Sequence, residues 1–169
     1  MDRALRGSRL IVVGLSAGFS FGVQGESGLF YEDERCLLNR MAVQGARVAI
    51  LLDDLPMLRE RASLESAAAD YIWVSPESAG MPCFPTARGE ALAALCHRRS
   101  LRMGDAAYIA TSPLDREAAM GAGRVLALAD AGDEVRRMAD NVLPARASGG
   151  LVLALLRARA FNPKLRDQS

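Results

Sequence analysis

Residues Gly14–Gly18 read Gly-Leu-Ser-Ala-Gly, a G-x-S-x-G pattern that can place a serine nucleophile on a sharp turn between a strand and a helix. Ser16 would attack, and His97, the single histidine of the chain, would be its general base. The orienting acid would be Asp53, Asp54 or Asp70. Only 13 residues precede Gly14, whereas hydrolases of this kind encode an oxyanion loop before the nucleophile. A Ser16 hydrolase is therefore an alternative, not the leading interpretation.

Metal and thiol chemistry have few candidate residues in this chain. The three cysteines, Cys36, Cys83 and Cys96, are widely spaced and include no C-x-x-C pair. A single histidine cannot supply a histidine-rich metal site. We expect three reduced thiols, as is usual for a cytoplasmic protein, and neither a zinc ribbon nor a disulfide framework.

The composition is that of one ordinary globular domain. The chain has 169 residues, of which 50% are hydrophobic and 24% charged, with a net charge of +1. This balance gives no electrostatic basis for binding nucleic acid or an anionic membrane. The longest apolar runs, Leu10–Leu15 and Leu151–Leu156, are far shorter than the roughly 20 residues of a membrane-spanning helix. We expect a single domain over residues 1–161 and a frayed polar tail over 162–169.

Short apolar runs alternate with helical patterns along the chain. Runs typical of buried strands cover 10–15, 47–52, 71–74, 106–110, 124–128 and 141–143. Helical patterns cover 33–44, 56–69, 88–99, 115–122, 133–139 and 150–159. The alternation predicts a Rossmann-like three-layer α/β/α fold with a parallel sheet of five or six strands. Aromatic residues and glycines over 18–30 predict a short hairpin or flap, and prolines over 75–87 predict a loop.

A longer pattern, spread over the whole chain, resembles a known family. It comprises Ala107–Ile109, Asp115, Gly123–Ala131, Val135–Ala139, Asn141–Val142 and Ser148–Gly150, with Arg47–Ile50 and Arg59–Ala62 before them. Over roughly residues 8–158 the chain is similar to the haloacid dehalogenase (HAD) superfamily, in the capless branch of 3-deoxy-D-manno-octulosonate 8-phosphate phosphatase. That branch includes the phosphatase-like C-terminal domain of acylneuraminate cytidylyltransferases. The resemblance implies a HAD-like fold and, where the site is intact, Mg²⁺-dependent phosphatase chemistry.

The resemblance also implies which catalytic positions have changed. The family's aspartate nucleophile and its aspartate acid/base fall on Gly14 and Ser16. Its phosphoryl-binding Thr or Ser falls on Leu52. Its helix-opening lysine falls on Arg88, which keeps the positive charge.

The family's metal-binding acids follow the fourth strand. Two of them fall on Thr111 and Ser112, and only the third survives, as Asp115. Neutral hydroxyl groups cannot replace carboxylates around Mg²⁺. We therefore expect no catalytic residue, no metal and no cofactor.

These departures predict a catalytically inactive phosphatase-like protein with a structural, oligomerising or regulatory role. Its setting would resemble that of the family, namely acidic-sugar metabolism of the octulosonate or sialic-acid type. One alternative is a binder of sugar phosphates or small anions that does not hydrolyse them, with Arg88, Thr111 and Ser112 lining its pocket. A residual HAD-type hydrolase is a further alternative, beside the Ser16 hydrolase.

The predicted hairpin is the candidate assembly surface. Alternation places Phe19 and Phe21 on one face of a strand, and Phe30 closes the same segment. An exposed apolar face of this kind usually meets a partner. The resemblance implies a tetramer built by such hairpins, so we expect a homo-oligomer, a tetramer or a dimer. An enzyme of an acid-sugar pathway is the other candidate partner. Alternatively, the segment folds back over the emptied cleft between Gly14 and Thr111.

Overall fold

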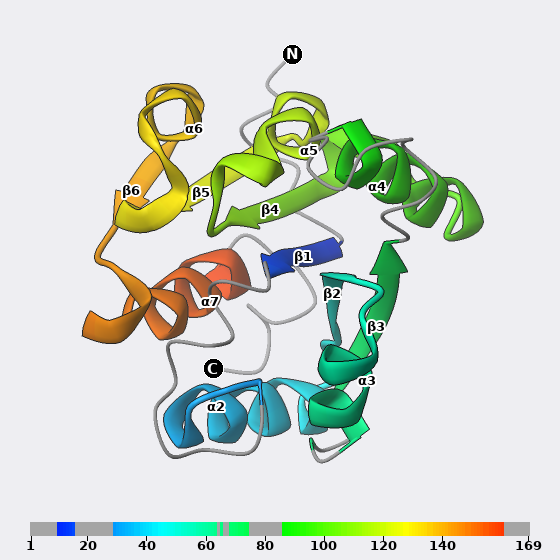
Figure 1. Ribbon diagram of the computed structural model, residues 1–169, viewed down its shortest axis with the longest axis vertical. Coiled ribbons are helices and arrows are strands. Elements are labelled where there is room, and N and C mark those ends of the chain that lie inside the picture. Colours follow the sequence, from blue (N-terminus) through cyan, green and yellow to red (C-terminus); the bar gives the residue numbers. More distant parts are fainter. Residues whose placement is uncertain (1–9, 16–28, 64, 66–67, 75–85, 161–169) are drawn as a thin grey trace.

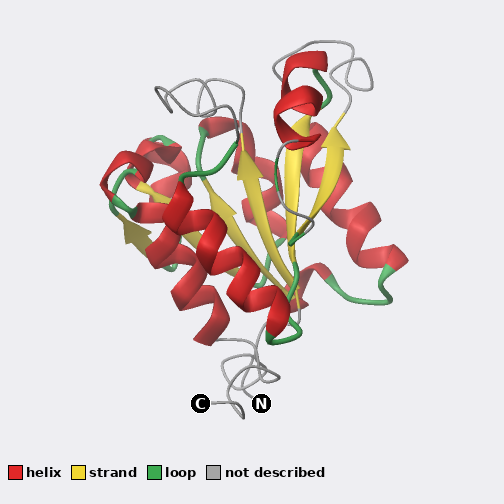
Figure 2. Ribbon diagram, turned by 90° about the horizontal axis from the view of Figure 1, so that it is seen from below, coloured by secondary structure: helices red, strands yellow, loops and turns green. Residues whose placement is uncertain are grey.

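Six strands form one parallel sheet in the order β3-β2-β1-β4-β5-β6, with helices on both faces (Figures 1 and 2). The strands are β1 (Leu10–Leu15), β2 (Val48–Asp53), β3 (Ala69–Val74), β4 (Ala106–Ala110), β5 (Arg124–Leu128) and β6 (Asn141–Leu143). The main helices are α2 (Glu32–Val43), α3 (Pro56–Ser63), α4 (Thr86–Arg98), α5 (Arg116–Gly121), α6 (Asp133–Met138) and α7 (Gly150–Ala160). The predicted three-layer α/β/α fold with a parallel sheet is confirmed.

This computed structural model describes residues 10–15, 29–63, 65, 68–74 and 86–160. Ser16, Phe19, Phe21 and nearly all of the predicted hairpin lie outside the described residues, as do most of the predicted loop over 75–87 and the predicted polar tail. In the part of the chain that is described, no helix is both long and apolar enough to cross a membrane.

Alternation along the strands divides the core into two layers. Ile11, Val13 and Leu15 of β1 pack on the side covered by α2, α3 and α7. Leu10 and Val12 pack on the opposite side, which α4, α5 and α6 cover. Both faces of β1 are therefore buried, as its continuous apolar run predicts.

The observed boundaries differ from the predicted ones mainly around α3. The predicted helix over 56–69 ends at Ser63, and β3 begins at Ala69, two residues earlier than predicted. Ala69 pairs with Val48 in the parallel ladder, so strand pairing overrides the helical preference of the alanines before it. The predicted helix over 115–122 is also shorter, because residues 113–115 form a 3₁₀ turn before α5.

The connectivity creates one switch point in the sheet. From β1 the chain proceeds outward to β2 and β3, and it then returns to the other side of β1 to form β4, β5 and β6. In open α/β sheets, ligands bind where the strand order reverses, outside the carboxyl ends of the two central strands. Here that place lies at the ends of β1 and β4.

Candidate functional site

The switch point brings together most of the positions that the sequence singled out. Gly14 is near the end of β1, Thr111 directly follows β4, and Arg88 reaches them from the first turn of α4. Asp115 lies in the turn between β4 and α5 and contacts all of these elements. The structure therefore brings these four positions together at the switch point.

Asp115 is the centre of this cluster and is fully buried. Its Oδ1 accepts hydrogen bonds from the Tyr108 hydroxyl (2.6 Å) and from Arg88 Nη1 (2.8 Å). Its Oδ2 accepts from the backbone N–H groups of Thr111 (2.8 Å) and Ser112 (3.1 Å). These four donors occupy the acceptor capacity of the carboxylate, which is about four lone-pair sites.

The local sequence explains why Asp115 points back toward the strand. Ser112 caps the 3₁₀ turn by accepting a hydrogen bond from the backbone N–H of Leu114 (3.2 Å), and Pro113 stands at the first position of the turn. The turn carries the Asp115 side chain over the N–H groups that follow β4. Ser112 is therefore a capping residue in this structure, and it is buried, with 7% of the residue exposed.

Arg88 is the buried cation of the site, with only 2% of its side chain exposed. Besides Asp115, it donates through Nη2 to the carbonyl oxygen of Leu15 (2.7 Å) and contacts Asp53 Oδ1 (3.5 Å). Burial is the largest single influence and lowers the pKa of the guanidinium, but the charge interactions with Asp115, Tyr108 and Asp53, together with the hydrogen bond to Asp115, outweigh it, so the pKa lies above its ordinary value. Arg88 is therefore charged, and its donors are directed at groups of its own chain.

Gly14, which the resemblance places at the family's nucleophile position, has no free space for a side chain. A Cβ atom at this residue would lie 2.0 Å from Asp115 Oδ1 and 2.3 Å from the Tyr108 hydroxyl oxygen. The Thr111 hydroxyl donates a hydrogen bond to the Gly14 carbonyl oxygen. The space into which a nucleophilic side chain would project is thus filled by the polar cluster.

Tyr108 is a member of this site that the sequence analysis missed. Burial, followed by the nearby Asp115 carboxylate, raises the pKa of its hydroxyl well above the ordinary value. The signal was present in the sequence, because Tyr108 is the single polar side chain in the strand Ala-Ala-Tyr-Ile-Ala. Alternation from the buried Ala106 and Ala110 places it on the inner side facing α4 and α5.

The remaining predicted site residues lie apart from this cluster. Leu52 packs in the core on the α2 side. Asp54 pairs with Arg59 on the surface, at 2.5 and 3.1 Å. Within the described residues, no group of three or more His, Cys, Asp or Glu side chains could hold a metal ion.

His97, the base of the alternative Ser16 hydrolase, lies at the far end of α4 from Arg88. Ser16 directly follows Leu15, whose carbonyl is bonded to Arg88 at the start of α4. His97 is exposed in the last turn of the same helix, nine residues further on, which is about 13 Å along the helix axis. Ser16 itself lies outside the described residues, so the Ser16 hydrolase stays an untested alternative.

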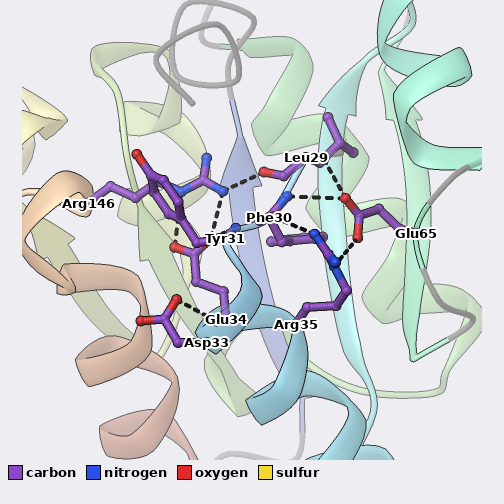
Figure 3. Close-up of polar contacts among 8 residues, drawn as sticks. All are labelled: Leu29, Phe30, Tyr31, Asp33, Glu34, Arg35, Glu65 and Arg146. Carbon is purple, nitrogen blue, oxygen red and sulfur yellow. Dashed lines mark hydrogen bonds and ion pairs between the residues drawn. The ribbon is translucent and has the colours of Figure 1, made fainter. Parts of the chain in front are cut away.

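A second buried polar cluster holds the chain where it enters α2 (Figure 3). Glu65 accepts hydrogen bonds from the backbone N–H groups of Leu29 (2.5 Å) and Phe30 (3.2 Å). Arg146 donates to the carbonyl oxygen of Leu29 (2.5 Å), and Arg35 donates to that of Phe30 (3.0 Å). Charged side chains from three separate parts of the chain therefore hold this short stretch of backbone.

Glu34 and Arg146 form the ion pair of this second cluster. Arg146 Nη2 lies 2.8 Å from Glu34 Oε1 and Nε lies 3.1 Å from Oε2, a fork-to-fork arrangement. Both side chains are at most 3% exposed. A pocket of about 510 Å³ adjoins the pair, between the first turn of α2 and the 3₁₀ turn Arg146–Ser148 that precedes α7. The sequence signal for Glu34 was its place on the apolar face of α2, ahead of Leu37, Leu38 and Met41.

The burial of Phe30 corrects the prediction that this residue belongs to an interface. Its side chain is 1% exposed and belongs to the core on the α2 side, and the Arg146 guanidinium lies 5.9 Å from its ring centre. Phe30 thus contributes to the chain's own core and presents no surface to a partner. The prediction grouped it with Phe19 and Phe21 because all three lie in one aromatic segment.

The fold is that of the HAD superfamily of hydrolases, as the resemblance in the sequence implied. The 3-deoxy-D-manno-octulosonate 8-phosphate phosphatase of Yersinia pestis aligns with a TM-score of 0.68 and 18% identity, over 97% of this chain and 86% of that one. The phosphatase of the same name from Moraxella catarrhalis, solved with magnesium, phosphate and its sugar acid, gives 0.67 and 17%, over 98% and 92%.

A Streptomyces avermitilis protein described as a HAD family hydrolase gives a TM-score of 0.64 and 17% identity, over 96% of this chain and 98% of that one. No family model and no curated protein sequence matches the chain. At these identities the likeness establishes the fold, and the chemistry has to be argued from the site itself.

Proposed function

We propose that this chain is a non-catalytic, phosphatase-like protein of the HAD fold. The observation that carries the proposal is the filled space at Gly14, where even a Cβ atom would overlap Asp115 and Tyr108. Covalent phosphoryl transfer needs a side-chain nucleophile at this position, and a glycine provides none. The chain therefore has no group at this position that could start the phosphoryl transfer by which such enzymes convert their substrates.

A resident magnesium ion does not fit the donors at this site. Mg²⁺ requires oxygen ligands in near-ideal octahedral geometry. Asp115 is the carboxylate best placed to bind it, and four hydrogen-bond donors already surround its two oxygens. The guanidinium of Arg88, 2.8 Å away, would repel a divalent cation. These contacts support the absence of a metal cofactor in the functioning protein.

The same contacts disfavour an anion pocket made by Arg88, Thr111 and Ser112. Arg88 donates to Asp115 and Leu15, and the Thr111 hydroxyl donates to Gly14. A phosphate group would have to displace these buried partners before it could bind. We therefore favour a structural or regulatory role within an assembly of this chain, in acidic-sugar metabolism of the kind that the octulosonate phosphatases serve.

The decisive experiment is a phosphatase assay on the full chain with Mg²⁺ present. p-Nitrophenyl phosphate and a series of sugar phosphates, including 3-deoxy-D-manno-octulosonate 8-phosphate, would serve as substrates. The Yersinia pestis phosphatase is the positive control. We expect release of phosphate at the level of the buffer blank, and turnover that EDTA abolishes would refute the proposal. A fluorophosphonate probe tests the Ser16 alternative, because only an activated serine should be labelled.

A further inference from the structure

The side chain of Arg88 supplies positive charge at the switch point. The Arg88 guanidinium donates in one direction to the Asp115 carboxylate and in another to the Leu15 carbonyl oxygen. A carboxylate and a backbone carbonyl are oxygen ligands of the kind that hard divalent cations take in proteins. Arg88 therefore satisfies, through fixed hydrogen bonds, oxygens that could otherwise have attracted a metal ion.

We propose that Arg88 stands in for a metal ion and that the former catalytic centre is now a permanent, metal-independent lock between β1 and β4. The inference rests on the proposed function, since a chain that turned over phosphate would need the site open and loaded. The lock consists of Arg88, Asp115, Tyr108 and Thr111, closed around Gly14.

The lock joins the two halves of the sheet at the place where an α/β fold normally leaves a crevice. Leu15 ends β1, and its carbonyl is held by Arg88 from α4. The Thr111 hydroxyl, directly after β4, bonds to the carbonyl of Gly14. Asp115 then connects β4 to α4, through Tyr108 on one side and Arg88 on the other. Each contact crosses between elements, so the cluster fixes their relative positions.

Arginine suits this task better than lysine would. Its planar fork presents donors in fixed directions, whereas a lysine ammonium is a single compact head. Nη1 serves Asp115 and Nη2 serves Leu15, with Asp53 at 3.5 Å from the same Nη2. Because Arg88 and Asp115 are both at most 2% exposed, removing either partner leaves a charge buried without compensation.

Thermal unfolding of the full chain tests the lock. Wild-type protein should have the same Tm in EDTA and in millimolar Mg²⁺. Arg88→Met removes the charge at similar length and should lower the Tm by on the order of 10 °C. The Tm of Arg88→Lys should lie between those of wild type and Arg88→Met, because lysine keeps the charge but cannot make both directed bonds. The double variant R88M with D115N should recover part of the loss, because no uncompensated charge then remains.

The matched control is Arg116→Met, at a surface arginine of the neighbouring α5 that pairs with Glu134 and is 37% exposed. It should shift the Tm by no more than a few degrees. If Arg88→Met does not fold, Tyr108→Phe removes only one donor to Asp115 and should still lower the Tm measurably.

A wild-type Tm that rises with Mg²⁺ would overturn the proposal. So would an Arg88→Met variant no less stable than Arg116→Met, or a Tyr108→Phe variant as stable as wild type. These readouts are independent of the phosphatase assay. Turnover would overturn the proposed function, whereas loss of the stability effects without turnover would overturn the lock alone.

Discussion

Gly14 is the residue at which the proposed loss of catalysis and the packing of the site meet. Gly14→Ala should destabilise the fold by roughly 1–3 kcal/mol or more, because the added methyl group overlaps Asp115 and Tyr108. Gly14→Asp should be at least as destabilised and should release no phosphate, since the nucleophile alone does not restore the other groups with which it acts. Denaturant titration and the phosphatase assay measure the two effects.

The control for this substitution is Gly104→Ala. A Cβ atom at Gly104 would meet no atom within 4 Å, so this change should leave stability nearly unaltered. Equal stability of the Gly14→Ala and Gly104→Ala variants would show that Asp115 and Tyr108 can move aside and leave room for a methyl group at Gly14. Robust turnover by Gly14→Asp would show that the rest of a catalytic site is intact.

Because the pKa of Tyr108 is raised, we expect the folded chain to lose stability in alkaline solution. Its pKa in the folded chain is raised above the ordinary value of 10.0 by burial and by Asp115. A raised pKa means that the folded state holds the proton more tightly, so the stabilisation is complete below about pH 10 and is lost as the pH rises toward the folded pKa. Denaturant midpoints between about pH 8 and about pH 11 should therefore decline.

Tyr108→Phe provides the comparison for this pH dependence. The variant lacks the titrating hydroxyl and should decline less steeply over the same range. Tyr71, whose pKa burial also raises, remains in both proteins, so part of the decline should persist. Identical pH profiles for variant and wild type would contradict the role assigned to Tyr108.

Residue types after the strands were enough to predict part of the site. Gly14, Arg88, Thr111 and Asp115 could be placed together because the resemblance assigns all four to one site. What spacing could not show was how the side chains satisfy one another. The turn of Asp115 back onto the N–H groups after β4 depends on a 3₁₀ turn, and the role of Tyr108 depends on which face of β4 it occupies.

At the scale of elements, strands were easier to predict than the ends of helices. β1, β4, β5 and β6 have the predicted bounds, because each is a short apolar run ended by a change in composition. The end of α3 was missed, since an alanine-rich segment suits a helix as well as a buried strand. Only pairing with β2 decides between them, and that contact is distant in sequence.

The second buried cluster should be the main anchor of α2. Arg146→Met removes the partner of Glu34 and the donor to the Leu29 carbonyl, and both groups are buried. We expect a loss of about 3–5 kcal/mol in the free energy of unfolding, because a buried carboxylate is left without its cation. Hydrogen exchange should also become faster at the start of α2, measured at Tyr31 and the residues after it.

Arg136→Met is the matched control for this prediction. Arg136 pairs with Asp133 within α6, and their side chains are 38% and 74% exposed. Such a surface pair contributes about 0–1 kcal/mol, so the variant should unfold at nearly the wild-type denaturant concentration. If the two substitutions had equal effects, Arg146 would not be the anchor that the geometry indicates.

At the scale of the whole molecule, the fold and the chemistry at its switch point depend on different sets of residues. The two core layers and the strand order depend on apolar side chains spread over the entire sheet. The predicted catalytic positions are a handful of residues at one edge of the sheet, and a fold can be kept while such positions differ. This separation explains why the fold could be predicted from patterns along the chain, whereas the function has to be argued from individual contacts.

We expect the chain to assemble through the segment that contains Phe19 and Phe21. Both stand in the segment that the resemblance implies is an assembly hairpin, and Phe30, which is buried in the core, is no longer a candidate. We expect size-exclusion chromatography with light scattering to give a mass two or four times 18.1 kDa at micromolar concentration. The double variant F19E/F21E should dissociate the oligomer, because each carboxylate buried in an apolar contact costs several kcal/mol. Val43→Glu, at an apolar side chain 89% exposed on α2, is the control and should leave the mass unchanged. A wild-type mass of one chain would reject assembly, and an oligomer unaffected by F19E/F21E would place its interface elsewhere.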